Sequence, residues 1–255
     1  MRPLSAFDDN YIWLLDDGAG GQAVVDPGDE DPVLEHLQAE GGRLDAILIT
    51  HRHGDHTGGI AGLLAAFPGI PVYAPRHETV RGATHPVGEG DLVRLGESGA
   101  SLRVLEVPGH TEGHIAYLGD GVLFSGDTLF SGGCGRVFGG THEQLYRSLR
   151  RIAGLPADTL VYCAHEYTLA NLGFARWVEP ENPALARRIA AAEAARERGE
   201  PTVPSSLALE LETNPFLRTD QPAVIAAAER YRGKRLTSGE AVFIAIREWK
   251  DREYD

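Results

Sequence analysis

The stretch "ITHRHGDHTGG" at residues 49–59 places three histidines and one aspartate within six residues, directly after the apolar run "DAILI". In an extended segment, side chains two residues apart face the same side, so His51 and His53 are expected to point at one centre. Asp55 and His56 follow across a glycine turn and are expected to face a second point close to the first. Imidazole and carboxylate groups bind Zn²⁺, Mn²⁺ and Fe²⁺, and burying four such groups without partners would cost several kcal/mol. The stretch therefore predicts a metal site at the end of a strand.

Three further polar residues follow apolar runs in the same way. His110 comes after "LRVLEVPG", Asp127 after "VLFSG" and His165 after "LVYCA". The sheets of α/β proteins place their sites just beyond the carboxyl ends of strands. Because four groups are too few to hold two metal ions, these three side chains are expected to complete a two-metal site.

The order of the apolar patterns predicts two structural units. Up to about residue 165, short β-branched runs that end in Gly, Pro, Asp or His alternate with helical patterns, which indicates a layered α/β domain. After that point the strand signal disappears and helical periodicity takes over. We therefore expect an α/β domain over residues 1–168, which carries the predicted metal site, and a helical domain over residues 169–255. The expected helix signals are Gly41 as a stop, Thr141 as an N-cap, and Thr237 with Glu240 as a capping box.

Composition and charge limit the classes of partner. With 255 residues and 42% hydrophobic residues the chain can bury a substantial core, and its apolar runs fall far short of the ~20 residues that span a bilayer. The net charge of −13 argues against nucleic acid, because a protein that neutralises phosphates needs a basic face. The acidic excess lies almost wholly in residues 1–170, so an anionic ligand is expected nearer the C-terminal third.

The ends and the cysteines of the chain bear on its compartment. The N-terminal segment "MRPLSAFDDN" lacks the apolar core of a signal peptide, and two cysteines, Cys134 and Cys163, are too few for a disulfide framework. We therefore expect a cytoplasmic protein with reduced thiols. A membrane partner and a nucleic-acid partner are not expected, and we expect a monomer.

The histidine-rich motif resembles the H-x-H-x-D-H signature of the metallo-β-lactamase superfamily, and other stretches are more particular. Together they resemble the glyoxalase II family, the hydroxyacylglutathione hydrolases, over nearly the whole chain and including the helical C-terminal part. These stretches are "GHTEGH" (109–114), "GDTLFSGGCGR" (126–136), "AHEYT" (164–168), "NPFLR" (214–218) and "REWKD" (247–251).

The resemblance implies an αββα sandwich that carries two divalent metal ions. Zinc is the first expectation, with iron or manganese as alternatives, because such His/Asp sites follow metal availability as much as affinity. In that family a hydroxide shared between the two ions attacks the thioester carbonyl, and Asp55 and Asp127 would carry the catalytic role among the ligands. The implied ligands are His51, His53 and His110 for one ion, Asp55, His56 and His165 for the other, and Asp127 as the bridge.

The resemblance also implies a site for the glutathione part of the substrate. By position it would be formed by Arg136, Tyr167, Arg247 and Lys250. A lysine often stands where Arg136 is found, which keeps the charge and changes its geometry. A tyrosine can occur where this chain has Phe138, so one hydrogen bond to the ligand is in question.

The implied activity is hydrolysis of S-(2-hydroxyacyl)glutathione, in particular S-D-lactoylglutathione, to D-lactate and glutathione. This is the second step of methylglyoxal detoxification. The residues are consistent with a substrate whose leaving group departs easily. A thiolate is such a group, because its conjugate acid has a pKa of roughly 8.5 and it departs without a strong proton donor. The motifs contain no obvious general acid beyond the metal ligands and Tyr167.

Several alternatives use the same cluster of residues. A β-lactamase, a lactonase or a phosphodiesterase could use the same metal centre, and a mononuclear iron persulfide dioxygenase would leave His56 without a role. A non-catalytic metal-binding or RNA-associated scaffold is a different class, which the complete ligand set and the acidic composition disfavour. Lys250 and Arg247 could also be an ordinary solvated helix end whose cations complement the helix dipole.

The remaining polar residues of interest receive simpler interpretations. Thr111 and His114 are expected to support the loop that carries His110. Asn10, at the start of an apolar strand with Tyr11 and Trp13, is expected to belong to the core. The histidines expected at the surface are His36, His77, His85 and His142.

Overall fold

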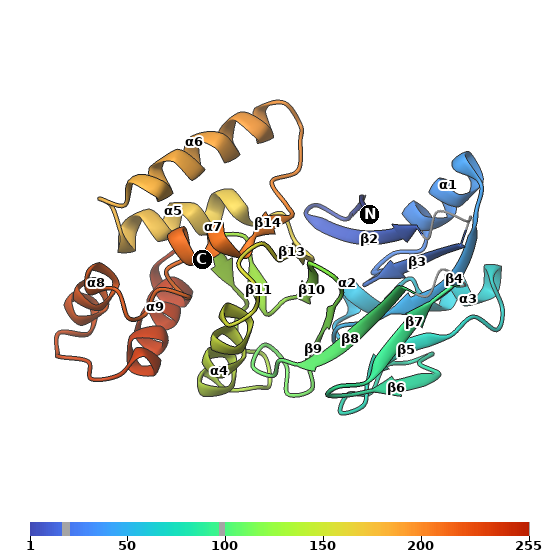
Figure 1. Ribbon diagram of the computed structural model, residues 1–255, viewed down its shortest axis with the longest axis horizontal. Coiled ribbons are helices and arrows are strands. Elements are labelled where there is room, and N and C mark those ends of the chain that lie inside the picture. The colour runs from blue at the N-terminus through green and yellow to red at the C-terminus, as the bar shows by residue number, and fades with distance from the viewer. Residues whose placement is uncertain (17–20, 97–99, 255) are drawn as a thin grey trace.

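The computed structural model describes residues 1–16, 21–96 and 100–254. Two sheets face each other in the middle of the molecule, with helices on the outer face of each (Figure 1). This is the αββα sandwich that the family resemblance implies. Within the described ranges, no helix has both the length and the apolar character needed to cross a membrane.

The first sheet is built from the N-terminal part of the chain in the order β1-β2-β3-β4-β5-β6. Its first three strands are antiparallel, and β3 to β6 run parallel. Three helices follow strands β3 and β4 along the chain. The elements are β1 (Arg2–Ala6), β2 (Asn10–Asp16), β3 (Gly21–Val25), α1 (Asp31–Glu40), β4 (Arg43–Leu48), α2 (Gly54–Thr57), α3 (Ile60–Ala66), β5 (Val72–Pro75) and β6 (His85–Val87).

The second sheet has the order β14-β13-β10-β9-β8-β7. Strands β10 and β13 are parallel, and the other neighbours in this sheet are antiparallel. A short hairpin, β11-β12, extends beyond the end of β10. The elements are β7 (Leu92–Leu95), β8 (Ala100–Glu106), β9 (Ile115–Leu118), β10 (Val122–Gly126), β11 (Leu129–Phe130), β12 (Gly133–Cys134), β13 (Leu160–Cys163) and β14 (Ser205–Ser206).

Alternate side chains along each strand pack into different layers of the core. Along β2, Tyr11 and Trp13 point between the two sheets, and Ile12 and Leu14 point toward the helices of the first sheet. Both sets are buried, as expected for strands covered on both faces. Burying each of the large side chains contributes about 1.5–3 kcal/mol, so the strands are held firmly in place.

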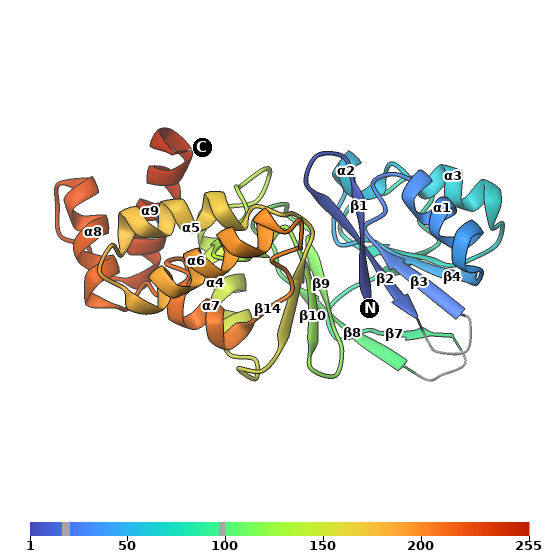
Figure 2. The same cartoon turned by 90° about the horizontal axis from the view of Figure 1, so that it is seen from above.

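Most of the C-terminal helices pack on the second sheet, and α5 and α6 also share a small buried cluster of their own. Phe174, Phe216 and Phe243 lie in one buried cluster with Leu123 and Val161 of the sheet. Figure 2 shows these helices gathered beside β10 and β14, on the side away from the first sheet. Their bounds are α4 (His142–Ala153), α5 (Thr168–Val178), α6 (Pro183–Glu197), α7 (Leu207–Thr213), α8 (Pro222–Arg232) and α9 (Gly239–Glu253).

Local signals for helix ends are confirmed in two places and wrong in a third. Thr141 caps α4 in a complete capping box, and α1 stops at Gly41, whose φ is 76°. The cap of α9 is Ser238 and not Thr237: the Ser238 hydroxyl accepts from the Ala241 amide at 3.1 Å. Two adjacent hydroxyl residues compete for the cap, and the extended backbone at Ser238 decides between them.

A second correction concerns the strand content after residue 165. The short strand β14 adds to the edge of the second sheet, where Ser205 pairs with Val161. A strand of only two residues is too short to show the alternation of apolar and polar residues by which strands are predicted. Through β14 the C-terminal segment is tied directly to the strand that precedes His165.

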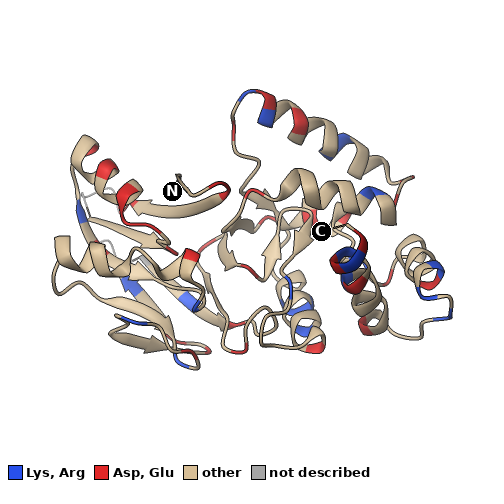
Figure 3. Cartoon of the chain, turned by 180° about the vertical axis from the view of Figure 1, so that it is seen from behind, with Lys and Arg blue, Asp and Glu red and all other residues tan. Residues whose placement is uncertain are grey.

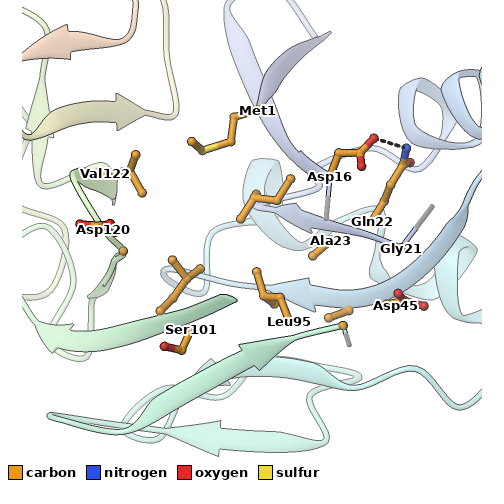
Figure 4. Close-up of a pocket in the computed structure, with 15 residues that line it drawn as sticks. Met1, Asp16, Gly21, Gln22, Ala23, Asp45, Leu95, Ser101, Asp120 and Val122 are labelled. Carbon is orange, nitrogen blue, oxygen red and sulfur yellow. Dashed lines mark hydrogen bonds between the residues drawn. The ribbon is translucent and has the colours of Figure 1, made fainter. Parts of the chain in front are cut away.

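The two ends of the sandwich have different characters. At the starts of β3, β4 and β8 lies a mainly apolar cavity of about 240 Å³, next to Leu15, Ala46 and Leu102 (Figure 4). Within the described ranges, its walls contain none of the residues predicted for the metal or substrate site. The carboxyl ends of the parallel strands lie at the opposite edge, and that edge carries the polar cluster.

Candidate metal centre

All seven predicted metal ligands come together at the carboxyl edge of the two sheets. The loop after β4 and the short helix α2 supply four of them, and the loops after β8, β10 and β13 supply one each. The sequence pattern predicted an open turn for Asp55 and His56. In the structure both residues lie inside α2. Three groups of ligand atoms can each enclose an ion: His51, His53 and His110; His51, His56 and Asp127; and Asp55, His56 and His165.

The first group consists of three imidazoles whose inner nitrogens face each other. Nε2 of His51 and Nε2 of His110 each lie 3.0 Å from Nδ1 of His53. A single ring proton on His53 could satisfy only one of these two neighbours. The three ring nitrogens therefore offer more lone pairs than protons at the point where they meet.

The outer nitrogens of two of these rings are already used. Nδ1 of His110 lies 2.7 Å from the Arg136 carbonyl, which can only accept, so Nδ1 carries the proton. The Thr50 hydroxyl donates to Asp26 at 2.7 Å, so it accepts from Nδ1 of His51 at 3.1 Å. Both rings consequently turn an unprotonated Nε2 inward.

The second group combines two imidazoles with a carboxylate. Oδ2 of Asp55 lies 3.5 Å from Nε2 of His56 and 3.5 Å from Nε2 of His165. On the outer side, Nδ1 of His165 donates to Oδ1 of Asp9 at 2.8 Å. Oδ2 of Asp26 lies 3.1 Å from Nδ1 of His56. Carboxylates therefore orient both rings of this group from behind.

Asp127 lies between the two groups and turns one oxygen toward each. Its Oδ1 is 3.5 Å from Nε2 of His56 and 3.4 Å from Nε2 of His165. Its Oδ2 is 3.5 Å from Nε2 of His110, which belongs to the first group. This is the position that a bridging carboxylate requires.

Burial and charge set the protonation states of these groups. Burial lowers the pKa of His51, His53 and His110, so these rings are neutral at pH 7. Burial alone would raise the pKa of Asp127, but the neighbouring His56 and His165 outweigh it and hold that pKa well below its usual range. For His56 and His165, burial is outweighed by Asp127, which raises the pKa of both rings, so these two lose a proton on binding a metal. The other groups are already in the neutral-imidazole or ionised-carboxylate forms that bind metal.

The donor set fits divalent cations. Nε2 of His56 and Oδ1 of Asp127 are buried and have no hydrogen-bond partner among the described residues. Such atoms cost free energy unless a cation satisfies them. Tetrahedral zinc with Zn–N bonds of 2.0–2.1 Å separates its ligands by roughly 3.3 Å, close to the spacings seen in both groups.

Three residues behind the ligands were not recognised from the sequence. Asp26 contacts His56 and Thr50, Asp9 contacts His165, and Nδ2 of Asn10 donates to Oδ2 of Asp55 at 3.2 Å. Asn10 thus orients a candidate ligand, although its strand neighbours belong to the core as expected. Asp26 directly follows β3, so the strand-end rule could have found it. Asp9 precedes β2 and Asn10 is its first residue, and the rule does not cover the start of a strand.

His114 supports the loop that carries Asp127 in addition to the one expected. Its Nε2 accepts from the backbone amide of Asp127 at 3.1 Å, and its Nδ1 lies 3.3 Å from Oγ1 of Thr128. The ring also stacks on His51, with centroids 4.7 Å apart. Thr111 does act within the His110 loop, where its carbonyl accepts from the Gly109 amide. The side chain of His114 therefore positions Asp127, while its carbonyl accepts from the Val107 amide at 2.9 Å and closes the loop that carries His110, as expected.

Gly126 permits the sharp turn that places Asp127, and we expect Gly126→Ala to lower the free energy of unfolding by about 2 kcal/mol or more. Its φ is +48°, and an added Cβ would lie 2.4 Å from Oγ1 of Thr50 and 2.8 Å from the His114 ring. Chemical denaturation measures the change. Gly121→Ala is the matched control: its φ is +71°, but no atom lies within 4 Å of the added Cβ. Equal losses in the two variants would contradict the steric argument.

A cleft of roughly 490 Å³ opens beside the metal centre. It is bordered on one side by His110 and Asp127, and on another by the four residues predicted to bind substrate. Those four come from the loop after β12, the end of the 164–168 stretch and helix α9. The residues that line it are Phe130, Cys134, Arg136, Phe138, Tyr167, Ala170, Asn171, Arg247 and Lys250, with the two candidate ligands.

The cations of the cleft differ in their access to solvent. The Arg136 side chain is 44% exposed, whereas Lys250 is 6% exposed and Arg247 is fully buried. Nζ of Lys250 donates to Oδ1 of Asn171 at 3.0 Å. The Arg247 guanidinium donates to the Cys134 carbonyl and to Asp251, so these hydrogen bonds hold it in the buried part of the cleft wall.

Tyr167 and Phe138 form the walls nearest the metal centre. Tyr167 stacks on the His165 ring with centroids 4.7 Å apart. Burial, followed by the nearby Asp9, raises its pKa, so the phenol keeps its proton and remains a hydrogen-bond donor. Phe138 is half exposed and meets the His53 and His110 rings edge to face.

The four histidines expected at the surface fall outside the cluster, as predicted. His77 and His85 are exposed, but His36 and His142 are only half exposed. His36 belongs to α1 and is partly covered there, because a helix face that packs on a sheet buries the flanks of its apolar stripe. None of the four takes part in a described ligand group.

Family models and relatives agree with this architecture. The model of the metallo-beta-lactamase superfamily matches residues 6–165, and the model of the hydroxyacylglutathione hydrolase C-terminus matches residues 166–253. The hydroxyacylglutathione hydrolase of Alkalilimnicola ehrlichii is 59% identical over 249 residues, with 97% of each chain covered. The one from Halorhodospira halophila is 52% identical over 250 residues, covering 98% of this chain and 97% of that protein.

Solved structures show the same fold. ETHE1 from Myxococcus xanthus matches with a TM-score of 0.66 at 29% identity, covering 97% of this chain and 90% of that one. TTHA1623, solved in a di-iron-bound form, matches with a TM-score of 0.61 at 28% identity, covering 85% of this chain and 100% of that one. The chain belongs to the metallo-β-lactamase superfamily. The C-terminal family model and the full-length relatives place it, within that superfamily, in the hydroxyacylglutathione hydrolase family.

Proposed function

We propose that the protein is a metal-dependent thioesterase that hydrolyses S-(2-hydroxyacyl)glutathione, in particular S-D-lactoylglutathione. Water is consumed, the bond between the acyl carbon and sulfur breaks, and the products are a 2-hydroxy acid and glutathione. The observation that carries the proposal is the single cleft that joins the candidate metal ligands His110 and Asp127 to Arg136, Tyr167 and Lys250. Family membership supports it, because the relatives are named for this activity.

The charge distribution suits an anionic substrate. Glutathione carries two carboxylates, and a chain with a net charge of −13 repels it unless local cations outweigh the overall field. Arg136 and Arg247 approach the one carboxylate of Asp251, and Lys250 adds a further positive charge to the same cleft. Figure 3 shows acidic and basic residues side by side on the helix that ends at the C-terminus.

Different residues of the chain are proposed to bind the two metal ions and to orient the metal ligands. When bound, two divalent ions supply a positive centre that polarises a carbonyl oxygen and lowers the pKa of bound water to ~7. We assign His51, His53 and His110 to one ion and Asp55, His56 and His165 to the other, with Asp127 between them. Asn10 donates to the Asp55 carboxylate and His114 accepts from the Asp127 backbone amide, so each holds one acidic ligand in place. Zinc is the metal we propose, with iron or manganese as alternatives.

The leaving group and the walls of the cleft favour a thioester. Departure of a thiolate needs no strong acid, because its conjugate acid has a pKa of roughly 8.5. Tyr167, which stays protonated, donates a hydrogen bond to the bound ligand, and Phe130 and Phe138 keep water away from it. We further propose that the protein acts as a cytoplasmic monomer on this small molecule, without a nucleic-acid or membrane partner, and that residues 169–255 act as the substrate-binding unit.

Hydrolysis of S-D-lactoylglutathione by the metal-loaded protein tests the proposal. Loss of the thioester absorbance is expected with the loaded protein and not after treatment with a chelator, and added Zn²⁺ is expected to restore it. A β-lactam serves as the control substrate, since its leaving amine needs a proton donor. Turnover of the β-lactam without turnover of the thioester would overturn the proposal.

A further inference from the structure

Glu78 lies at the edge of the metal centre without touching it. It follows β5, whose neighbour in the parallel sheet is β4, so its loop emerges beside the loop that carries His51 and His53. The Glu78 side chain is only 1% exposed. A buried carboxylate needs partners, and here the partners are two backbone amides and one guanidinium.

The two carboxylate oxygens of Glu78 connect two separate loops. Oε2 accepts from the backbone amide of Arg52 at 2.6 Å, and this residue lies between the two histidines of the first motif. Oε1 accepts from the backbone amide of Gly113 at 3.1 Å, in the loop that carries His110. Nη1 of Arg52 lies 3.3 Å from the same Oε1 and balances the charge.

From these contacts we infer that Glu78 is a positioning residue for the three-histidine metal site. It joins the only two loops that supply His51, His53 and His110, so it sets the distance between ligands that are far apart in the sequence. The second site lacks this support within the described ranges: Asp9 and Asp26 orient its rings instead. The inference rests on the two-metal assignment in the proposed function.

The geometry of the residues around Glu78 explains why a carboxylate of this length is needed. Two amides must be accepted at once, and a glutamine offers one acceptor and one donor, so one amide would face a donor. An aspartate keeps both acceptors and the charge but is shorter by one methylene and cannot reach both loops. Gly113 leaves room for the side chain, since a Cβ there would lie 2.5 Å from Cγ of Glu78.

Cobalt binding to isolated sites tests the inference. In a His165→Ala background the three-histidine site is the one left to bind Co²⁺, and in a His53→Ala background the other site is left. Adding Glu78→Gln is expected to weaken Co²⁺ binding about 10–100-fold in the first background and less than 2-fold in the second. Glu78→Asp is expected to fall between wild type and Glu78→Gln. The affinities are measured by competition with a chelator, monitored through the visible spectrum of Co²⁺.

Hydrogen exchange provides a second readout that does not depend on metal. In the metal-free protein, Glu78→Gln is expected to accelerate exchange of the Arg52 and Gly113 amides relative to their neighbours. Glu179→Gln is the matched control, because Glu179 is a buried carboxylate that pairs with Arg218 far from both loops. It is expected to lower stability while leaving both cobalt affinities unchanged.

The outcomes separate this inference from the proposed function. Unchanged cobalt affinity of the three-histidine site in Glu78→Gln would overturn the inference, and so would an equal loss at both sites. If the wild-type protein binds fewer than two ions, the two-metal assignment fails instead. Loss of thioesterase activity is not used as the criterion.

Discussion

Asp127→Asn is expected to lower kcat for S-D-lactoylglutathione by about 10³-fold or more, with KM changed by much less. The two oxygens of Asp127 face different ligand groups, at 3.4 and 3.5 Å from Nε2 of His165 and His110. An amide offers a single neutral acceptor, so it cannot serve both groups. We also expect the variant to retain less than two equivalents of metal, which elemental analysis of the purified protein measures.

Asp120→Asn provides the control for this experiment. Asp120 is exposed at the turn before β10, at the opposite end of the strand that leads to Asp127. Its replacement removes the same charge from the same hairpin and is expected to leave kcat and metal content unchanged. A variant of Asp127 that binds both ions and turns over at the wild-type rate would contradict the bridging role.

Replacing both Arg136 and Lys250 by methionine is expected to raise KM about 100-fold while kcat changes little. Hydrogen bonds to charged groups contribute about 1.5–3 kcal/mol each, and about 3 kcal/mol in total corresponds to this factor. Methionine keeps much of the length of both side chains, and the Arg136 carbonyl that accepts from His110 is unaffected. Initial rates over a range of substrate concentrations separate the two constants, since loss of uniform binding appears in KM.

Arg151→Met is the matched control for the loss of positive charge. Arg151 pairs with Glu89 on the surface, at 2.6 Å, and does not line the cleft. Its removal is expected to leave KM within a factor of 2. A double variant that lowers kcat and leaves KM unchanged would place Arg136 and Lys250 in the reaction and not in substrate binding.

Much of the site could be anticipated because its candidate ligands obey one rule. His51, His110, Asp127 and His165 each follow a strand within a few residues, and parallel strands bring those positions to a single edge. Asp55 and His56, which come directly after His53 in the same motif, then complete the second group with His165. The sequence could not indicate that these last two residues lie in a helix, because four residues are too few to show a period.

The contacts behind the ligands could not be anticipated in the same way. Asp9 and Asn10 reach the centre because β2 runs antiparallel to β3, which brings the start of one strand beside the end of the other. Glu78 reaches it because β5 is the neighbour of β4 in the sheet. Both facts depend on the order of strands, and a local pattern contains no information about which strands become neighbours.

The residue patterns predicted the layered α/β class, the helical C-terminal part and the candidate metal residues, and the family resemblance added the candidate substrate residues. The patterns could do so because side-chain alternation and ligand spacing are local properties of the chain. The tertiary structure was needed to show that Arg247 is buried in the wall of the cleft while Arg136 is exposed, and that the His114 side chain positions Asp127. Burial and orientation depend on what packs from elsewhere in the chain, and long-range packing is settled only when the two sheets and the C-terminal helices share their cores.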